Sequence, residues 1–182
     1  MKTSFIFLAD GFEEVEAMTS VDVMRRAGMP VVTVSINEGV AVTGAHGVTV
    51  VADSVFGDND YSDAEWLVLP GGMPGATNLA AHEGLSALLD AQDERGGKFS
   101  AICASPAIVL APKGLLQDRD AVCYPGMEAD EEGVRWGDAQ VAVSGNVVTG
   151  NGPAAAAPFA LAMVAESLGQ DAADQVASGM LL

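Results

Sequence analysis

Short apolar runs alternate along the chain with longer segments in which apolar residues recur every three or four positions. The first such unit predicts a strand over 5–9, a helix over 13–27 and a second strand over 31–35. Arg26 followed by Gly28 marks the end of this helix, because a basic residue and then glycine favour a helix C-terminus. The pattern therefore indicates a βαβ unit at the start of the chain.

The same alternation continues to the C-terminus. Further strands are expected over 66–69, 99–102, 139–143 and 147–149, and further helices over 78–94, 106–111 and 155–168. Uniformly apolar strands that alternate with helices are typical of a mostly parallel sheet covered on both faces. We therefore expect an α/β fold, and one domain over 1–182 because no repeat or linker interrupts the pattern. Ligands of such folds bind beyond the carboxyl ends of the strands.

Charge and composition narrow the classes of partner. The 182 residues include 8 Lys and Arg against 25 Asp and Glu, a formal net charge of -17, which disfavours nucleic acid and anionic membranes as partners. The longest apolar stretch, 154–165, is shorter than the ~20 residues that a bilayer requires. The first residues lack the long apolar segment of a signal peptide. We expect a cytoplasmic protein that binds neither membrane nor nucleic acid.

The strand expected over 99–102 leads directly into a cysteine. Cys103 is followed by Ala104, Ser105 and Pro106, and proline suits the first turn of a helix. The sulfur is therefore expected at a tight strand-to-helix turn, where nearby helix amides favour the thiolate. A small buried cysteine without chemistry is the competing interpretation of the same position.

Glycines follow the strand expected over 66–69. Gly71, Gly72 and Gly75 resemble a backbone nest, in which N–H groups converge on an anion, although an ordinary Gly/Pro turn explains them as well.

Four carboxylates crowd the start of the first expected helix; they are Asp10, Glu13, Glu14 and Glu16. Acidic residues complement the dipole of a helix start. If one of them is buried, it would instead hold a proton at neutral pH. The residues alone do not decide between these interpretations.

Histidine is scarce, so few general bases are available to a cysteine nucleophile. His46 and His82 are the two histidines, and both are expected on surface turns or helix starts. No Cys/His cluster has zinc spacing and no phosphate-binding loop is present. We therefore expect no metal and no cofactor.

Five segments, in this order and at this spacing, resemble the DJ-1/PfpI (ThiJ) superfamily, and within it the DJ-1 branch. They are residues 10–16 (DGFEEVE), 21–28 (VDVMRRAG), 69–72 (LPGG), 101–106 (AICASP) and 152–161 (GPAAAAPFAL). The resemblance spans nearly the whole chain. It implies a flavodoxin-like three-layer sandwich with a mostly parallel central sheet, usually assembled as a homodimer.

By position, the resemblance also implies roles for four residues. Cys103 corresponds to the reactive cysteine and Glu16 to the glutamic acid that hydrogen-bonds its sulfur. Gly72 and Ala104 correspond to the residues whose amides form an anion pocket. The implied activity is a cysteine-dependent, cofactor-independent glyoxalase or deglycase acting on small reactive aldehydes such as methylglyoxal, linked to oxidative-stress protection. The alternative is a non-enzymatic redox sensor or chaperone that uses oxidation of the same cysteine.

The chain departs from DJ-1 at the expected pocket. Tyr124 stands before a proline where DJ-1 has histidine, and His46 and Asn151 stand where DJ-1 has arginines at the pocket entrance. With Glu13, these residues are expected to line the pocket. The residue after the cysteine is Ala104, where the PfpI proteases have histidine, so a protease or amidase is the less favoured enzyme.

The first helix carries more apolar residues than one buried stripe needs. They are Val15, Met18, Val21 and Met24 at steps of three, with Val23 beside them. As in the DJ-1 branch, we expect a homodimer contact through helix 13–27, with Met24 within it. The contact is expected to bring His46 toward the pocket of the second subunit.

Overall fold

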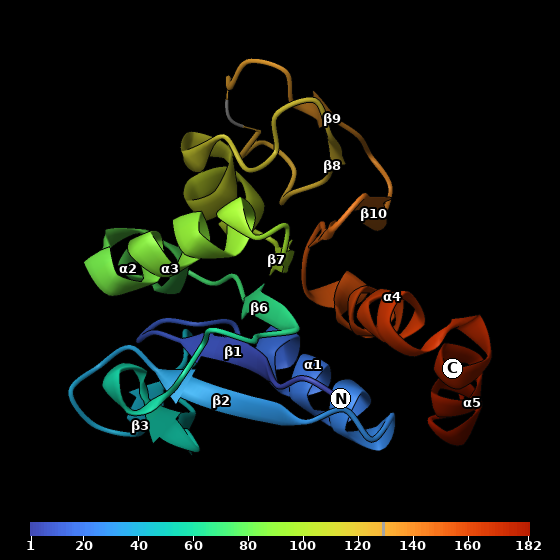
Figure 1. The fold of residues 1–182 in the computed structure, drawn as a ribbon, viewed down its shortest axis with the longest axis horizontal. Helices are drawn as coiled ribbons and strands as arrows, with labels where there is room; N and C mark the ends of the chain where they lie inside the picture. The colour runs from blue at the N-terminus through green and yellow to red at the C-terminus, as the bar shows by residue number, and fades with distance from the viewer. Residues whose placement is uncertain (129) are drawn as a thin grey trace.

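A seven-stranded sheet lies at the centre of the computed structural model, which describes residues 1–128 and 130–182 (Figure 1). Its strands, in spatial order, are β10 (Val141–Ser144), β11 (Val147–Gly150), β7 (Lys98–Ile102), β6 (Trp66–Leu69), β1 (Ser4–Leu8), β2 (Val31–Ser35) and β5 (Ser54–Val55). All neighbouring pairs in this sheet are parallel except β10 and β11. The expectation of a mostly parallel sheet is confirmed.

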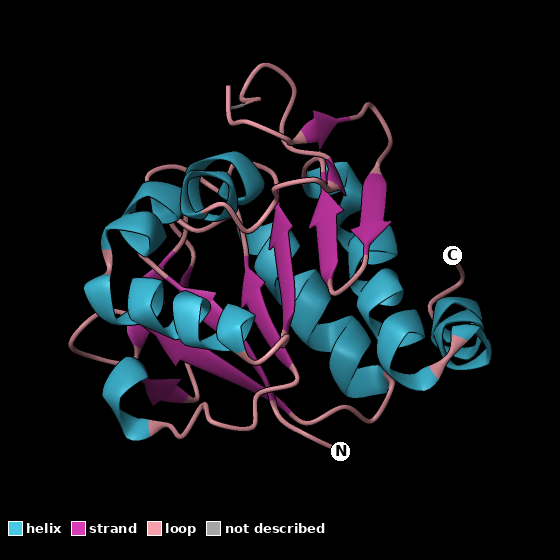
Figure 2. Cartoon of the chain, turned by 45° about the horizontal axis from the view of Figure 1, so that its top comes forward, coloured by secondary structure: helices cyan, strands magenta, loops and turns pink. Residues whose placement is uncertain are grey.

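Helices cover both faces of the sheet (Figure 2). One face carries α1 (Glu14–Arg26), α4 (Ala156–Leu168) and α5 (Gln170–Gly179); the other carries α2 (Gly75–Ala81), α3 (Glu83–Glu94) and the π-helical turn η2 (Pro106–Leu110). Side chains of β1 alternate between the two cores, because Ile6 and Leu8 pack under α1 and α4 whereas Phe5 and Phe7 pack under α3. This is the expected three-layer sandwich.

Smaller elements complete the described chain. They are the hairpin of β3 (Ala41–Thr43) and β4 (Thr49–Val51), the short pair of β8 (Asp120–Ala121) and β9 (Arg135–Trp136), and the 3-10 turns η1 (Phe56–Asp58), η3 (Ala111–Lys113) and η4 (Pro153–Ala155). Among the helices of the described residues, none has the length and apolar character needed to cross a membrane.

The helix expected over 78–94 is in fact two helices, divided at His82. This residue has an extended backbone, and its Nδ1 accepts a hydrogen bond from the Leu85 N–H at 2.9 Å. The histidine therefore acts as the N-cap of α3. Helix α5 was not expected from the sequence, because it buries only Ala173 and Val176 among its ten residues.

The buried face of α1 is not the apolar row seen in the sequence. Each step of three turns a helix by about 300°, so a row of four such residues winds roughly half way round the axis. Accordingly Val15 is 51% exposed, whereas Met24, at the other end of the row, is fully buried in the chain's own core. The expectation that Met24 supplies a dimer contact is therefore wrong, and Val15 is the exposed member of the row.

Candidate active site

The candidate site lies where four neighbouring parallel strands end. Strands β11, β7, β6 and β1 are adjacent in the sheet, and their carboxyl ends lie along one edge. Cys103 directly follows β7, Gly71 and Gly72 follow β6, and Asn151 follows β11. The loop after β1 leads into α1, which carries Glu16. Residues far apart in the sequence are thus brought to one place.

Cys103 occupies a strained turn between β7 and η2. Its φ is +62°, a left-handed conformation that residues other than glycine rarely adopt. Its N–H donates to the Gly150 carbonyl at 2.9 Å, and its carbonyl accepts from the Tyr124 N–H at 2.8 Å. The buried Ser105 hydroxyl donates to the Pro70 carbonyl at 2.6 Å. These three hydrogen bonds hold the Cys103 turn in place. Local sequence patterns do not identify Ser105 as a site residue, because its bond to Pro70 joins segments that are distant in the sequence.

Glu16 brings a buried carboxyl group to the same place. Its side chain is inaccessible to solvent, and its Oε2 accepts a hydrogen bond from the Gly71 N–H at 2.8 Å. The other carboxyl oxygen of Glu16, Oε1, is buried and has no hydrogen-bond partner among the described residues. The Cys103 thiol approaches this carboxyl closely enough to act as a donor that lowers its pKa. The Glu16 carboxyl therefore has one hydrogen bond from a backbone amide, that of Gly71, and lies close to the Cys103 sulfur.

Burial sets the protonation of Glu16. Desolvation raises the pKa of this carboxyl to about 7, against the lowering effect of its hydrogen bonds, and the charge of Glu13 raises it further. At neutral pH roughly half of the molecules hold a proton there. Of the two causes that the sequence suggested, burial of one carboxyl is the larger and crowding by neighbouring carboxylates the smaller.

The missing side chain of Gly71 leaves room for the Glu16 carboxyl and the Cys103 side chain to lie close together. A Cβ at this position would lie 2.5 Å from the Cys103 Cβ and 2.7 Å from the Glu16 Oε2. Gly72 next to it has a φ of +90°, and a Cβ there would collide with the Glu13 nitrogen and the Gly11 carbonyl. Only glycine allows both residues of this loop to approach the site.

The backbone amides of Gly72 and Ala104 form hydrogen bonds with the Cys103 sulfur. Both hydrogen bonds lower the pKa of Cys103, but burial and the charge of Glu16 outweigh them and raise it to about 12. The position of Cys103 at a helix start predicts a readily ionised thiol, but in the structure the thiol is protonated at neutral pH. Because the carboxylate charge opposes the thiolate, the sulfur ionises most easily when its proton passes to Glu16.

The second cysteine has a different environment. Cys123 is only 5% exposed, and its thiol donates to the Tyr124 carbonyl at 3.6 Å. Burial, together with the charge of Glu128, raises its pKa to about 11. Cys103 is partly exposed, and both cysteines are free. Access to solvent, rather than the pKa of the resting thiol, distinguishes Cys103.

An open cavity of about 390 Å³ lies beside the cysteine turn. Its lining residues are Tyr124, Pro125, Asn151, Gly152, Pro153 and Ala154. The segments on either side are tied to the Cys103 backbone through Tyr124 and Gly150. The structure thus gathers Tyr124 and Asn151, two of the four residues expected to line a pocket, around one cavity.

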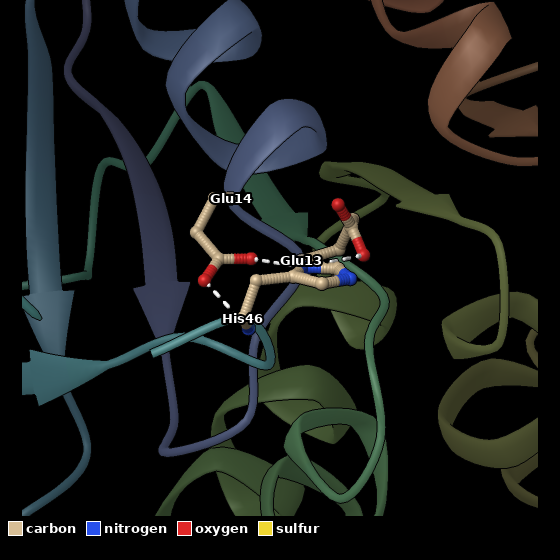
Figure 3. Close-up of side chains that lie close together, drawn as sticks. All are labelled: Glu13, Glu14 and His46. Carbon is tan, nitrogen blue, oxygen red and sulfur yellow. Dashed lines mark hydrogen bonds and ion pairs between the residues drawn. The ribbon is translucent and has the colours of Figure 1, made fainter. Parts of the chain in front are cut away.

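Glu13 and His46, the other two, belong to a separate cluster at the start of α1 (Figure 3). The His46 Nδ1 lies 2.8 Å from the Glu14 Oε2 and 3.7 Å from the Glu13 Oε2. The Glu14 Oε1 also accepts from the His46 N–H at 2.8 Å, and a side chain at Gly44 would overlap this carboxyl. The contact with Glu14 raises the pKa of the exposed imidazole, and hydrogen bonds lower the pKa of Glu14 despite its partial burial.

The sequence did not predict this cluster, because the loop between β3 and β4 brings His46 to α1 across more than thirty residues. Glu13, Glu14 and His46 place three potential metal ligands within 4.8 Å of one another. The His46 ring contacts both carboxylates, so the cluster is explained by ion pairing without a metal. The role of His46 at a second subunit stays a prediction.

Known proteins resemble this chain over most of its length. The family model for the DJ-1/PfpI family matches residues 2–166. Protein DJ-1 homolog B of Arabidopsis thaliana is 35% identical over 96% of this chain, and protein dj-1beta of Drosophila melanogaster is 33% identical over all of it and 97% of the relative. A protein of Pyrococcus abyssi named deglycase PYRAB04690 is 33% identical over 81% of the chain and 89% of its own length. The chain spans 40% and 47% of the length of two Arabidopsis relatives, DJ-1 homologs B and A.

Solved structures give the same result. A mutant of the DJ-1 superfamily protein STM1931 from Salmonella typhimurium superposes with a TM-score of 0.92 at 33% identity, covering 100% of this chain and 98% of the other. Oxidized DJ-1 of Toxoplasma gondii superposes with a TM-score of 0.91 at 34% identity and the same coverage. With the matched family model, these relatives and the fold in agreement, the chain belongs to the DJ-1/PfpI family.

Proposed function

We propose that this protein converts small α-oxoaldehydes such as methylglyoxal to hydroxy acids, as a cysteine-dependent glyoxalase or deglycase that needs no cofactor. One observation carries the proposal: the Glu16 carboxyl, held by the Gly71 amide, lies against the Cys103 thiol, and the amides of Gly72 and Ala104 reach the sulfur. A nucleophile, a base and oxyanion donors are thereby within reach of one carbonyl group. The deglycase name of the Pyrococcus relative supports the same reaction class.

In the proposed reaction, the Glu16 carboxylate takes the thiol proton as the sulfur of Cys103 adds to the aldehyde carbon. The new carbon–sulfur bond gives a hemithioacetal, whose oxygen the amides of Gly72 and Ala104 stabilise. Glu16 returns the thiol proton to this oxygen, so that the carboxylate is again free to act as a base. It then takes the proton of the former aldehyde carbon and delivers it to the neighbouring carbonyl carbon, while the hydroxyl proton passes to the oxygen of that carbonyl. These transfers convert the hemithioacetal into a thioester of the hydroxy acid. Water cleaves the thioester, releasing the hydroxy acid and restoring the thiol. The net change is addition of one water molecule, with no external oxidant or reductant.

The direct test is to incubate the purified protein with methylglyoxal alone and to quantify lactate. We expect one lactate per methylglyoxal consumed without glutathione, nicotinamide or added metal. Loss of methylglyoxal without lactate would show simple trapping by the protein and would contradict the proposed reaction.

Tyr124 is expected to shape the cavity without taking part in the chemistry. Its ring is 49% exposed and lies against Gly152, and no hydrogen bond joins its hydroxyl to another described residue. Tyr124→Phe should therefore leave kcat/KM for methylglyoxal within about tenfold, or about 1.4 kcal/mol of barrier. A loss of ~1000-fold, in the range of general acid–base catalysis, would instead assign a proton-transfer role to the hydroxyl.

We further propose that residues 1–182 form one domain that assembles as a homodimer through helix 13–27. The exposed Val15, with Met18 and Val21 only partly buried, leaves apolar surface on α1. Val15→Asp should shift the mass measured by light scattering at low micromolar concentration from about twice 18.5 kDa toward the monomer. Aspartate is favoured in a first helical turn, so the fold of the monomer should be retained. A monomeric wild type would remove the proposed dimer.

A further inference from the structure

Negative charge dominates the surroundings of the candidate site. The carboxylate of Glu16 acts on Cys103, that of Glu13 acts on Glu16, and that of Glu128 acts on Cys123. Each of these interactions disfavours a further negative charge at its target. The charged side chains that act on these three groups are therefore all acidic.

The cations of the chain are all engaged elsewhere. The described residues include all eight Lys and Arg, and each has a partner of its own. The pairs are Lys2 with Asp63, Arg25 with Asp53, Arg26 with Asp22, Lys98 with Glu65, Lys113 with Asp90 and Arg135 with Asp120, while Arg95 and Arg119 donate to the carbonyls of Tyr61 and Ser144.

The fold keeps several of these cations away from the site. Lys2 precedes β1 and Lys98 begins β7, so both lie at the amino ends of strands whose carboxyl ends form the site. Arg25 and Arg26 end α1, whose first turns carry Glu14 and Glu16. None of the six residues that line the cavity beside Cys103 is charged.

His46 is the one cationic side chain of the cluster beside Glu13, and it is already paired. Its ring binds Glu14 and lies 3.7 Å from Glu13 (Figure 3). Two carboxylates therefore oppose one imidazolium, and the net charge of the cluster stays negative. Among the described residues, an incoming carboxylate or phosphate finds no unpaired Lys or Arg to bind.

We propose that the site accepts uncharged α-oxoaldehydes and discriminates against those that carry a carboxylate or phosphate group. This inference rests on the proposed function for its substrates, and on the distribution of charged side chains for its selectivity. An anionic substrate would meet the repulsion of these carboxylates, with no unpaired Lys or Arg among the described residues to offset it, and such repulsion is how charge excludes a wrong ligand.

The same repulsion has a consequence for the product. An uncharged aldehyde and one water molecule give a hydroxy acid, which ionises at neutral pH and releases a proton. The product thus acquires the charge that the site repels. We expect lactate to be a weak inhibitor, because the reaction converts an uncharged aldehyde into an anion that the carboxylates of the site repel.

A matched pair of substrates tests the selectivity. The anion 4,5-dioxopentanoate and its methyl ester carry the same oxoaldehyde and differ in one charge. At low ionic strength kcat/KM for the ester should exceed that for the acid by about tenfold or more. Added salt should narrow the ratio because it screens the repulsion.

Two variants identify the source of the effect. Glu13→Gln should narrow the ratio between ester and acid, whereas Asp174→Asn removes the same charge from an exposed site on α5 and should leave the ratio unchanged. The ratio is the readout because a change in the Glu16 proton would affect both substrates alike. An equal effect of the two variants would show that overall charge, and not the site, discriminates.

A second measurement does not depend on turnover. Uncharged iodoacetamide and anionic iodoacetate alkylate the same sulfur, so the ratio of their rates at Cys103, relative to a free thiol, reports the local charge. We expect this ratio to favour iodoacetamide and to narrow in Glu13→Gln. An unshifted ratio would overturn the inference. Failure to convert either aldehyde, with the alkylation ratio shifted as expected, would instead overturn only the proposed function.

Discussion

Replacing Cys103 by serine is expected to lower methylglyoxal turnover by ~1000-fold or more. A serine hydroxyl is a far weaker nucleophile than a thiol, and the carboxyl of Glu16, whose pKa is about 7, is a poor base for it. Lactate formation by wild type and variant at equal concentration is the measurement. Serine is close in size to cysteine, so the turn between β7 and η2 should be kept, and circular dichroism and the unfolding midpoint should report this.

Cys123→Ser is the matched control, because it changes the chain's other cysteine at a buried position outside the candidate machinery. It should retain turnover within a few fold. Peroxide followed by peptide mapping should place added oxygen on Cys103 first, since Cys123 is less accessible. If Cys123 proved the oxidised residue, or Cys123→Ser the inactive variant, the assignment of the nucleophile would be wrong.

Glu16→Gln is expected to separate thiol reactivity from proton transfer. The amide cannot accept the thiol proton, so turnover should fall by ~100-fold to ~10,000-fold. Removal of the carboxylate also removes a charge that raises the pKa of Cys103, so the thiol pKa should fall and alkylation by iodoacetamide at neutral pH should become faster. Glu16→Ala should also lose turnover, but its alkylation by iodoacetamide should speed up less, because alanine also removes a hydrogen-bonding group. Full turnover by Glu16→Gln would exclude Glu16 as the acid–base group.

The pH dependence of the wild type follows from the same group. The carboxylate is the form that accepts the thiol proton, so kcat/KM for methylglyoxal should rise with pH and level off above the Glu16 pKa of about 7. The rising limb should disappear in Glu16→Gln. A profile with the same limb in both proteins would assign the titration to another group.

Stability should change with pH in the direction that the pKa of Glu16 dictates. The folded protein holds this proton up to about pH 7, whereas the unfolded chain releases it near 4.5. The folded state therefore binds more protons between these values, and the free energy of unfolding should fall as pH rises through them, by up to about 3 kcal/mol. Urea unfolding at pH 4.5 and pH 8 should show Glu16→Gln gaining stability relative to wild type only at the higher pH. An equal difference at both pH values would contradict the buried, titrating carboxyl.

The parts of the fold that depend on local patterns could be predicted from the sequence. Strands 31–35 and 66–69 coincide with β2 and β6, because each is a short apolar run bounded by Gly, Pro or acidic residues. The parallel arrangement followed from buried strands that alternate with helices. The position of Cys103 after a strand and before a proline-led helical turn could also be predicted, since it depends on consecutive residues.

Features that depend on contacts between segments distant in the sequence could not be predicted from local patterns. The pKa of Glu16 is set by burial beneath the loop after β6, more than fifty residues away, and the sequence shows only neighbouring acids. The need for glycine at position 71, where a side chain would collide with Glu16 and Cys103, is equally long-range. The apolar row of α1 misled because its members wind around the helix, so that Val15 faces solvent while Met24 enters the core.

The backbone of Cys103 connects the reacting sulfur to the cavity mechanically. Its N–H and its carbonyl bind Gly150 and Tyr124, and the residues that follow or include these two form most of the cavity wall. Any displacement of this backbone would act on both segments of the cavity wall at once, through two backbone hydrogen bonds and no intervening side chain.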